Sequence, residues 1–276
     1  MDNTWYRGIA VGVDGSDESL AALDWAARTA DMHGARLTVV ATYPLPTTLA
    51  PGYGDLASTA KGAARNAAQA AQIRLGRHRP GRRDVEVLVL PGSAAPALSQ
   101  RSMTCDLVVV GRRGLGVLDR TLLGSTSSAL VASAPGAVAV IPAGATTGDP
   151  SRIRVGVGRE EEPGVLGTAF AEAAVRGCPL EVLHVTGSDP TAAVDLADQV
   201  ARWAEKYPKV TCTMVIRHGA PASALLHDLT ADDVVIVGGR QHSPAPGRRQ
   251  HSIPDAVLRA APCPVLVVHA QRNPLA

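Results

Sequence analysis

Glycines and hydroxyl residues in the first half of the chain have a spacing suited to holding a phosphate. Gly111 and Gly114 stand at and just after the end of the run DLVVVG (106–111), nine residues intervene, and Gly124 and Ser125 come next. Glycines let a backbone turn tightly and approach a ligand closely. Residues 124–127 begin a predicted helix, whose first amides, hydroxyls and positive dipole end favour an anion. This spacing predicts phosphate binding.

Two charged residues extend the predicted site. Asp14, in the segment VGVDGS (11–16), has a carboxylate that can accept hydrogen bonds from ribose hydroxyls or hold Mg²⁺ between phosphates. Arg120, four residues before Gly124, brings a permanent positive charge to the same anion. Taken singly, the glycines also fit ordinary turns, Ser125 an N-cap and Arg120 a surface position. Their combination in this order is what favours a nucleotide site.

The elements that would hold these residues follow from hydrophobic patterning. Apolar, β-branched runs alternate with Ala- and Leu-rich stretches of helical period. Most of the apolar runs lack polar alternation, so both of their faces should be buried, as in parallel sheets covered by helices. The right-handed crossover rule then predicts a doubly wound, five-stranded sheet, which binds ligands beyond the carboxyl ends of its strands, where the strand order reverses. In the first half the predicted strands lie near 8–14, 36–42, 85–90, 106–111 and 137–142, and the predicted helices near 17–33, 55–78, 93–102 and 125–134.

The second half repeats the first. IAVGVDGS (9–16) recurs as IRVGVGRE with an offset of 144 residues, and DLVVVG (106–111) recurs as DVVIVG with an offset of 127. The change of offset places a deletion in the second copy, between its second and third strands. We therefore predict an α/β protein of two tandem domains, 1–145 and 151–276, each with a doubly wound parallel sheet, joined by a linker at 144–152.

Nucleotide chemistry is expected in the first copy alone. A glycine in place of the aspartate offers no carboxylate to ribose, and a histidine in place of a glycine adds bulk where backbone must approach phosphate. The loop 239–254 leaves two interpretations open: it binds another ligand through His242, His251, Arg248 and Arg249, or it is a solvated remnant of the motif. At the repeat positions the changes are Asp14 to Gly158, Gly114 to Gln241, Arg120 to Gly247 and Gly124 to His251, while Gly238 and Ser252 persist.

On these residues the sequence resembles the universal stress protein family. The family pattern of Gly, two residues, Gly, nine residues, then Gly and Ser or Thr is met fully within 111–125, and the blocks 11–27 and 122–135 resemble the strongest blocks of the family. The tandem layout is similar to that of actinobacterial members. The resemblance implies a Rossmann-like fold, ATP as ligand, and nucleotide contacts by Gly12, Asp14, the backbone of Thr42, Gly111, Arg112, Arg113, Gly114, Arg120, Gly124, Ser125, Thr126 and Ser127.

Composition disfavours several other classes of protein. The net charge is +2 and aromatic residues make up 3%, so a nucleic-acid surface with stacking aromatics is disfavoured. The four cysteines are scattered without metal-ligand spacing, which favours small buried thiols over disulfides or metal sites. No stretch fits a membrane span, and the first residues lack the basic and apolar regions of a signal peptide. A cytoplasmic location is predicted.

The expected function is that of an ATP-binding stress-response protein in which ATP regulates conformation or partner choice. No Ser-His-Asp or Cys-His arrangement and no general base can be assigned, so no catalytic residue is named. Slow ATP hydrolysis and a structural or interaction protein of the same fold that binds no nucleotide stay as alternatives. Mg²⁺ is expected only with ATP, through Asp14.

Assembly is predicted from the last strand of each copy. Edge strands with unpaired backbone groups seek partners. The strands 137–142 and 264–269 are therefore expected to pair with each other as an intramolecular pseudo-dimer, and a homodimer is the further expected assembly.

Overall fold

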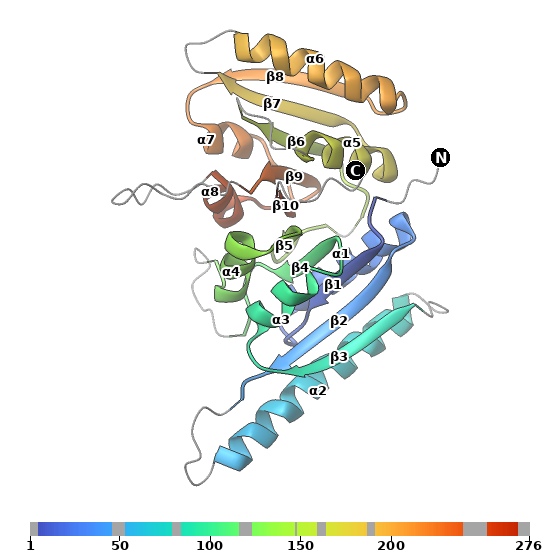
Figure 1. Cartoon of the computed structure of the whole chain (residues 1–276), viewed down its shortest axis with the longest axis vertical. Coiled ribbons are helices and arrows are strands. Elements are labelled where there is room, and N and C mark those ends of the chain that lie inside the picture. Colours follow the sequence, from blue (N-terminus) through green and yellow to red (C-terminus); the bar gives the residue numbers. More distant parts are fainter. Residues whose placement is uncertain are drawn as a thin grey trace. The chain divides into compact units, whose positions relative to one another are not determined.

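The computed structural model of the chain divides into two compact units. The first unit spans Tyr6–Ala143, and the second spans Gly144–Ala276 and includes Trp5. Figure 1 shows the helices and strands of both units. The structure describes residues 5–45, 53–78, 84–115, 123–146, 148–158, 164–186, 191–239 and 253–269.

The first unit is a five-stranded parallel sheet with the strand order β3-β2-β1-β4-β5. Helices α1 and α2 pack on one face, against β1 and β2 among others, and α3 and α4 pack on each other and on the opposite face. The predicted elements of this half are confirmed with shifts of a few residues at their ends. They are β1 (Gly8–Gly12), α1 (Asp17–His33), β2 (Arg36–Tyr43), α2 (Tyr53–His78), β3 (Val85–Pro91), α3 (Ala94–Arg101), β4 (Leu107–Gly111), α4 (Ser125–Ser133) and β5 (Ala137–Ile141).

The second unit has the same topology. Its strands follow the order β8-β7-β6-β9-β10, all parallel, which is the order of the first unit repeated. The predicted fold class, two doubly wound α/β units in tandem, is confirmed. The elements are β6 (Arg152–Val157), α5 (Val165–Arg176), β7 (Leu180–Thr186), α6 (Thr191–Lys206), β8 (Cys212–His218), α7 (Pro221–Leu226), β9 (Asp233–Gly238), α8 (Ile253–Ala260) and β10 (Val265–Val268).

Small residues let the helices of the first unit approach its sheet closely. Helix α2 buries a stripe at helical spacing, made of Ala64, Ala67, Ala68, Ala71 and Leu75. The strands β1 and β4 are almost wholly buried, because helices cover both of their faces. A chain with few aromatic residues therefore builds this core from Ala, Val, Leu and Ile.

The same glycine-to-leucine contact occurs in both units. A Cβ on Gly12 of β1 would lie 2.8 Å from Cδ1 of Leu98, and a Cβ on Gly156 of β6 would lie 2.9 Å from Cδ1 and Cδ2 of Leu225. The two glycines occupy equivalent repeat positions, and so do the two leucines. Because the second copy lacks the nucleotide motif, this contact explains the glycine at position 12 by packing alone.

The last strand of each copy lies at one end of its own unit's strand order, β5 after β4 and β10 after β9. Each of these two strands therefore has one backbone edge that does not pair with a strand of its own unit. The expected pairing of these two strands with each other, and the expected homodimer, stay predictions.

Candidate functional site

The predicted site residues gather where the strand order of the first unit reverses. Strand β1 leads through α1 to β2 on one side, whereas β4 pairs with β1 on its other side. Open α/β sheets bind ligands in the crevice at this point, beyond the carboxyl ends of the strands. Asp14 follows β1 and the segment 112–115 follows β4, so both reach the crevice.

Asp14 joins the two sides of this crevice. Its Oδ1 accepts hydrogen bonds from the backbone N–H (3.0 Å) and the hydroxyl (2.6 Å) of Ser16, and its Oδ2 accepts one from the N–H of Leu115 (3.1 Å). Gly15 makes the intervening turn with φ of 88°, a conformation that favours glycine. Burial raises the pKa of Asp14, but the hydrogen bonds from Ser16 and Leu115 outweigh it and hold the pKa below the ordinary range. Asp14 is therefore a carboxylate that stays ionised at neutral pH.

The segment after β4 is fixed by a second carboxylate, that of Glu18 in the first turn of α1. Glu18 Oε2 accepts a hydrogen bond from the backbone N–H of Arg113 (2.6 Å), and Oε1 accepts one from Arg113 Nε (2.9 Å) and a short one from Nη2. A Cβ on Gly111 would lie 2.9 Å from the carbonyl carbon of Glu18, so only glycine fits there. The close approach made possible by Gly111 is thus to the protein's own helix.

The other two motif glycines also fit close internal contacts. A Cβ on Gly114 would overlap Oδ2 of Asp14, so its absence is what lets the carboxylate reach the segment. A Cβ on Gly124 would lie 3.0 Å from the carbonyl oxygen of Arg112. That oxygen accepts hydrogen bonds from the N–H of Gly124 (2.9 Å) and the hydroxyl of Ser127 (2.9 Å). The glycine spacing, which the sequence predicts to serve phosphate binding, is thus also required by close contacts of the segment after β4 with the rest of the protein.

The first turns of α1 and α4 differ in how well they can bind an anion. Helix α1 is capped by Ser16, whose hydroxyl accepts the N–H of Ser19 (3.2 Å), and its first turn carries Asp17 and Glu18. Helix α4 begins after Gly124, which has no side chain to cap it, and its first turn carries no charge of its own. The dipole of α1 is already matched by carboxylates, whereas that of α4 is not. An anion at this edge is therefore expected at α4.

The backbone of Thr42 faces the crevice from β2. Along a parallel strand the N–H and C=O groups of successive residues point alternately to the two neighbouring strands. Val40 C=O accepts the N–H of Val13 (2.9 Å), so Val40 faces β1 and Thr42 faces the same side. Strand β1 has ended at Gly12 by this level, which leaves the Thr42 groups pointing into the space above it. This placement suits the predicted contact with adenine.

The sequence is similar to a known protein family along most of its length. The model of the Universal stress protein family matches residues 6–142 and 191–269. The chain belongs to the universal stress protein family. A universal stress protein of Mycolicibacterium smegmatis is 33% identical, with 95% of this chain and 96% of the relative covered. One of Mycobacterium tuberculosis is 34% identical, with 95% and 96% covered.

The fold has a full-length counterpart among solved structures. A universal stress protein from Archaeoglobus fulgidus has a TM-score of 0.70 and 19% identity, with 95% of this chain and 96% of that chain covered. At this identity the likeness concerns the fold alone. Family membership and the tandem arrangement predicted from the repeat are both confirmed, since the family model matches the chain in two segments and the relatives are aligned over nearly their whole length.

The structure brings together most of the site residues predicted for this universal stress protein. Glu18 was missed by sequence reasoning, because an acidic residue in a first helical turn usually serves only the helix dipole. Ser127 is buried and its hydroxyl binds backbone carbonyls, while Ser125 is exposed. Arg120 lies outside the described residues. The residues brought to the crevice are Gly12, Asp14, Thr42, Gly111, Arg112, Arg113, Gly114, Gly124, Ser125, Thr126 and Ser127.

The corresponding edge of the second unit is built differently. Gly158 follows β6 where Asp14 follows β1, and Gly239 follows β9. Past the end of β10 stands His269, 5% exposed, whose ring would be overlapped by a Cβ on Gly239. Burial lowers the pKa of His269, so the ring is neutral at physiological pH. The counterparts of Gly114, Arg120, Gly124 and Ser125, within the predicted loop 239–254, lie outside the described residues.

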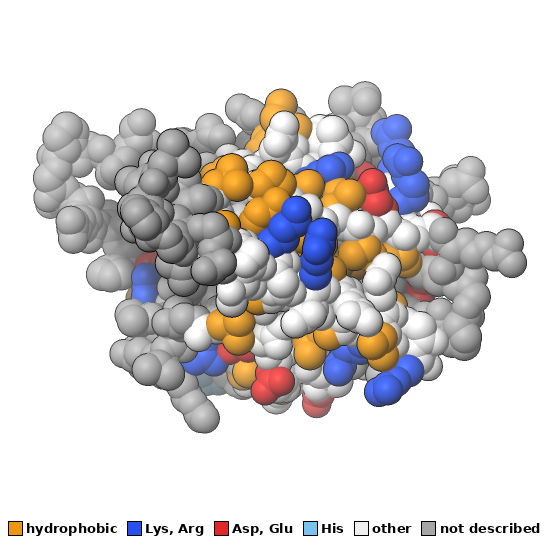
Figure 2. All heavy atoms as spheres, turned by 90° about the horizontal axis from the view of Figure 1, so that it is seen from below, with side chains coloured by type: hydrophobic (Ala, Val, Ile, Leu, Met, Phe, Trp, Pro, Cys, Tyr) orange, Lys and Arg blue, Asp and Glu red, His pale blue; other side chains and the backbone are white. Residues whose placement is uncertain are grey.

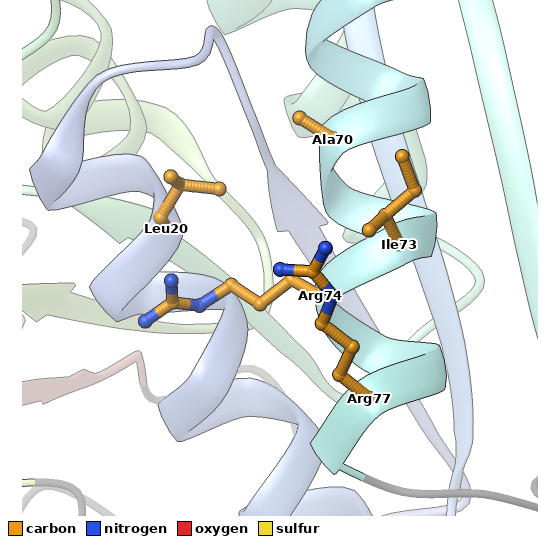
Figure 3. A pocket seen from close by; sticks show the side chains of 5 residues that line it. All are labelled: Leu20, Ala70, Ile73, Arg74 and Arg77. Carbon is orange, nitrogen blue, oxygen red and sulfur yellow. The ribbon is translucent and has the colours of Figure 1, made fainter.

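A groove of about 270 Å³ lies elsewhere on the first unit, between α1 and α2. Figure 3 shows Leu20 on α1 and Ala70, Ile73, Arg74 and Arg77 on α2 lining it. Arg74 also pairs with an aspartate of α1 across the groove. Figure 2 shows one face of the molecule, on which apolar side chains surround basic ones. The groove contains none of the predicted site residues.

Within the described residues no group of three or more His, Cys, Asp or Glu side chains could hold a metal ion. None of the described helices has the length and apolar character needed to cross a membrane. A divalent cation at Asp14 would therefore need most of its ligands from the nucleotide and water.

Proposed function

We propose that the first unit binds ATP at the crevice between β1 and β4, and that ATP acts as a regulatory ligand. The observation that carries the proposal is the position of Asp14. An ionised carboxylate stands at the point where the strand order reverses, hydrogen-bonded to the segment after β4, and that segment in turn holds the beginning of α4. Carboxylate, turn and helix N-terminus together match the ribose and phosphate groups of a nucleotide.

The residues present fit such a ligand. An ionised carboxylate has about four acceptor positions, so Asp14 can bind ribose hydroxyls or a Mg²⁺ carried by ATP in addition to its present partners. The first amides of α4 and its unmatched dipole face an anion, and Arg120 supplies charge from the adjacent segment of the sequence. Thr42 offers backbone groups on the opposite side for the base.

A regulatory role is favoured over fast catalysis. Activation of water for attack on a phosphate needs a base within hydrogen-bond reach. Asp14 and Glu18, the carboxylates that contact the segment after β4, are both committed to hydrogen bonds with it, and the pKa of Asp14 is lowered. A carboxylate with a low pKa is a weak base. The second unit keeps its strands and helices without the motif, as expected if its role is to pack and present a surface.

The test is a calorimetric titration of the whole protein with ATP. We expect about one ATP per chain. Asp14→Ala should weaken binding by about 1–3 kcal/mol, the cost of losing hydrogen bonds to a charged group. Asp24→Ala is the matched control, because Asp24 pairs with Arg74 on the groove surface, away from the crevice. Two equivalent sites, or none, would contradict the proposal, and none would favour a structural protein of the same fold.

A turnover measurement separates ligand from substrate. With saturating ATP and Mg²⁺ the protein should release phosphate well below about 1 s⁻¹, the low end for ordinary enzymes. Faster release would favour an ATPase in place of the regulatory role. Slow hydrolysis below that rate is compatible with ATP acting as a signal.

A further inference from the structure

We infer that Glu18 is a positioning residue for the phosphate-binding segment, and that Arg113 is its structural partner and not a phosphate ligand. The inference rests on the proposed function, because it concerns how the same crevice is shaped. It reverses the role that family resemblance gives to Arg113. Its basis is the buried hydrogen-bonding arrangement between α1 and the segment after β4.

Glu18 holds Arg113 at both backbone and side chain. One carboxylate oxygen accepts the backbone N–H, and the other accepts Nε and Nη2 of the guanidinium. Planar guanidinium groups bind carboxylates in this forked manner with high geometric specificity. Arg113 therefore has its backbone and its charge fixed by one residue that lies 95 positions earlier in the chain.

Burial makes the pair costly to open. The side chain of Arg113 is 16% exposed and that of Glu18 is 9% exposed. Separating a buried ion pair leaves an uncompensated charge on each partner. For Arg113 to turn its guanidinium to a phosphate, Glu18 would have to remain buried with only the backbone N–H of Arg113 and without its charged partner. A nucleotide gains more from the unmatched helix end of α4, which needs no such separation.

The pair determines the path of the whole segment. Gly111 packs directly on the backbone of Glu18 just before Arg113. On one side of Arg113, the carbonyl of Arg112 receives the N–H of Gly124 and so fixes the beginning of α4. On the other side, Leu115 donates its N–H to Asp14. Loss of the Glu18 contact would loosen the helix that faces phosphate, whereas Asp14, which faces ribose, would keep its hydrogen bonds from Ser16.

The repeat supplies an independent observation. The second copy has lost the counterparts of Asp14 and Gly114, yet Arg113 corresponds to Arg240 at the offset of 127 residues. Glu18 corresponds to Glu162 at the offset of 144, or to Glu161 at the offset of 143 that applies further along. Residues of both types thus stand at these sequence positions of the second copy, and both positions lie outside the described residues.

The first experiment is a double-mutant cycle with Glu18→Gln, Arg113→Gln and the double variant, each titrated with ATP and with adenosine. Glutamine keeps the volume of Glu18 and removes its charge. ATP affinity should fall about tenfold in each single variant and no further in the double variant, because both changes break one unit. Adenosine affinity should stay within about twofold, since adenosine has no phosphate. A merely structural role would move both ligands equally.

A direct phosphate contact by Arg113 gives a different result. Arg113→Gln would then weaken ATP much more than Glu18→Gln, the two losses would add in the double variant, and the inference would be overturned. Arg113→Lys is the milder variant should glutamine destabilise the fold. It keeps the charge and the backbone hydrogen bond but loses the fork, and should weaken ATP binding less than Arg113→Gln.

The second experiment needs no ligand and separates this inference from the proposed function. Amide hydrogen exchange of the free protein, followed by NMR, should be faster by about tenfold at Leu115 and Gly124 in Glu18→Gln, because their hydrogen bonds depend on the fixed segment. Glu86→Gln is the control, since Glu86 lies on the edge strand β3, where it accepts a hydrogen bond from Thr38 of β2, away from the segment after β4. Unchanged exchange at Leu115 and Gly124 overturns the positioning role, whether or not the wild-type protein binds ATP.

Discussion

Each unit has charged groups that tie its elements together, and these groups lie at opposite ends of the strands in the two units. In the first unit Asp14 and Glu18 stand beyond the carboxyl ends of β1 and β4, where they hold the segment after β4. In the second unit a cluster of charges lies toward the amino ends of the strands, around Arg152 and Arg154 of β6, and a further buried pair, Glu172 with Arg176, lies within α5. The fold accommodates charged groups at either end of its strands, but only the carboxyl end coincides with the expected ligand-binding crevice.

Arg154 shows how the second unit uses its charges. It occupies the repeat position of Ala10, is 2% exposed, and donates to Glu181 (2.6 Å), the carbonyl of Leu225 (3.0 Å) and Asp228 (2.7 Å). These partners are all from the same unit and come from two separate parts of its chain, β7 and the segment 225–228. The arrangement ties β6 to β7 and to the segment before β9. We interpret it as structural, in contrast to the carboxylates of the first unit.

The largest expected effect comes from removing this buried guanidinium. Arg154→Met should destabilise the protein by about 3 kcal/mol, because it leaves buried acceptors without their donor. Urea unfolding followed by circular dichroism measures the loss, and ATP stoichiometry should not change. Arg259→Met is the control, since Arg259 pairs with Asp255 on an exposed helix face and should cost about 0.5 kcal/mol or less. Equal losses of stability in the Arg154 and Arg259 variants would contradict the structural role assigned to Arg154.

The next effect should fall on ligand binding in the first unit. Gly114→Ala places a Cβ against Oδ2 of Asp14 and should weaken ATP binding by about 1.4 kcal/mol, or tenfold, as the carboxylate is displaced. Gly62→Ala in α2 is the matched control, because its Cβ meets nothing within 4 Å. That change should leave affinity unaltered and stabilise the helix by about 0.5–1 kcal/mol. Calorimetry and thermal unfolding give the two readouts, and equal affinities for ATP would contradict the assignment of Gly114.

A smaller effect should be shared by the two units. Gly12→Ala and Gly156→Ala both push on the end of a leucine side chain, Leu98 and Leu225 respectively, and should each cost about 1 kcal/mol of stability. Similar losses in chemical unfolding would show that Gly12 is required by packing in both copies. A large loss of ATP affinity in Gly12→Ala without loss of stability would instead assign that glycine to the ligand.

The smallest expected effect is a dependence of stability on acid pH in the second unit. Hydrogen bonding to Arg154, with Arg152 contributing, lowers the pKa of Asp228 to about 2. A lowered pKa means that the carboxylate contributes stability above its ordinary pKa of about 3.9, and that this contribution disappears as pH falls through about 2. The difference in unfolding free energy between the wild type and Asp228→Asn should therefore shrink between about pH 4 and pH 2. A difference that stays constant across this range would contradict the pairing.

The sequence determined the fold of this protein almost completely. Continuous apolar runs, helical periodicity and the repeat predicted the strands and helices of the first unit, and a doubly wound parallel sheet in both units. They also predicted that Asp14 and the segment after β4 meet, because the reversal of strand order follows from topology. Both the elements and their meeting place thus follow from the amino-acid sequence.

Only the tertiary structure decided what the site residues contact. The spacing of Gly111, Gly114 and Gly124 reads as room for a ligand, yet each glycine also admits a specific part of the protein itself. Glu18 and Arg113 are 95 residues apart, and nothing in either local pattern marks them as partners. Which side chains meet across β1 and β4 depends on strand register and helix rotation, which a one-dimensional pattern specifies only in part. The burial of Arg154 has the same origin, because an arginine in a strand shows its partners only when the neighbouring strands are in place.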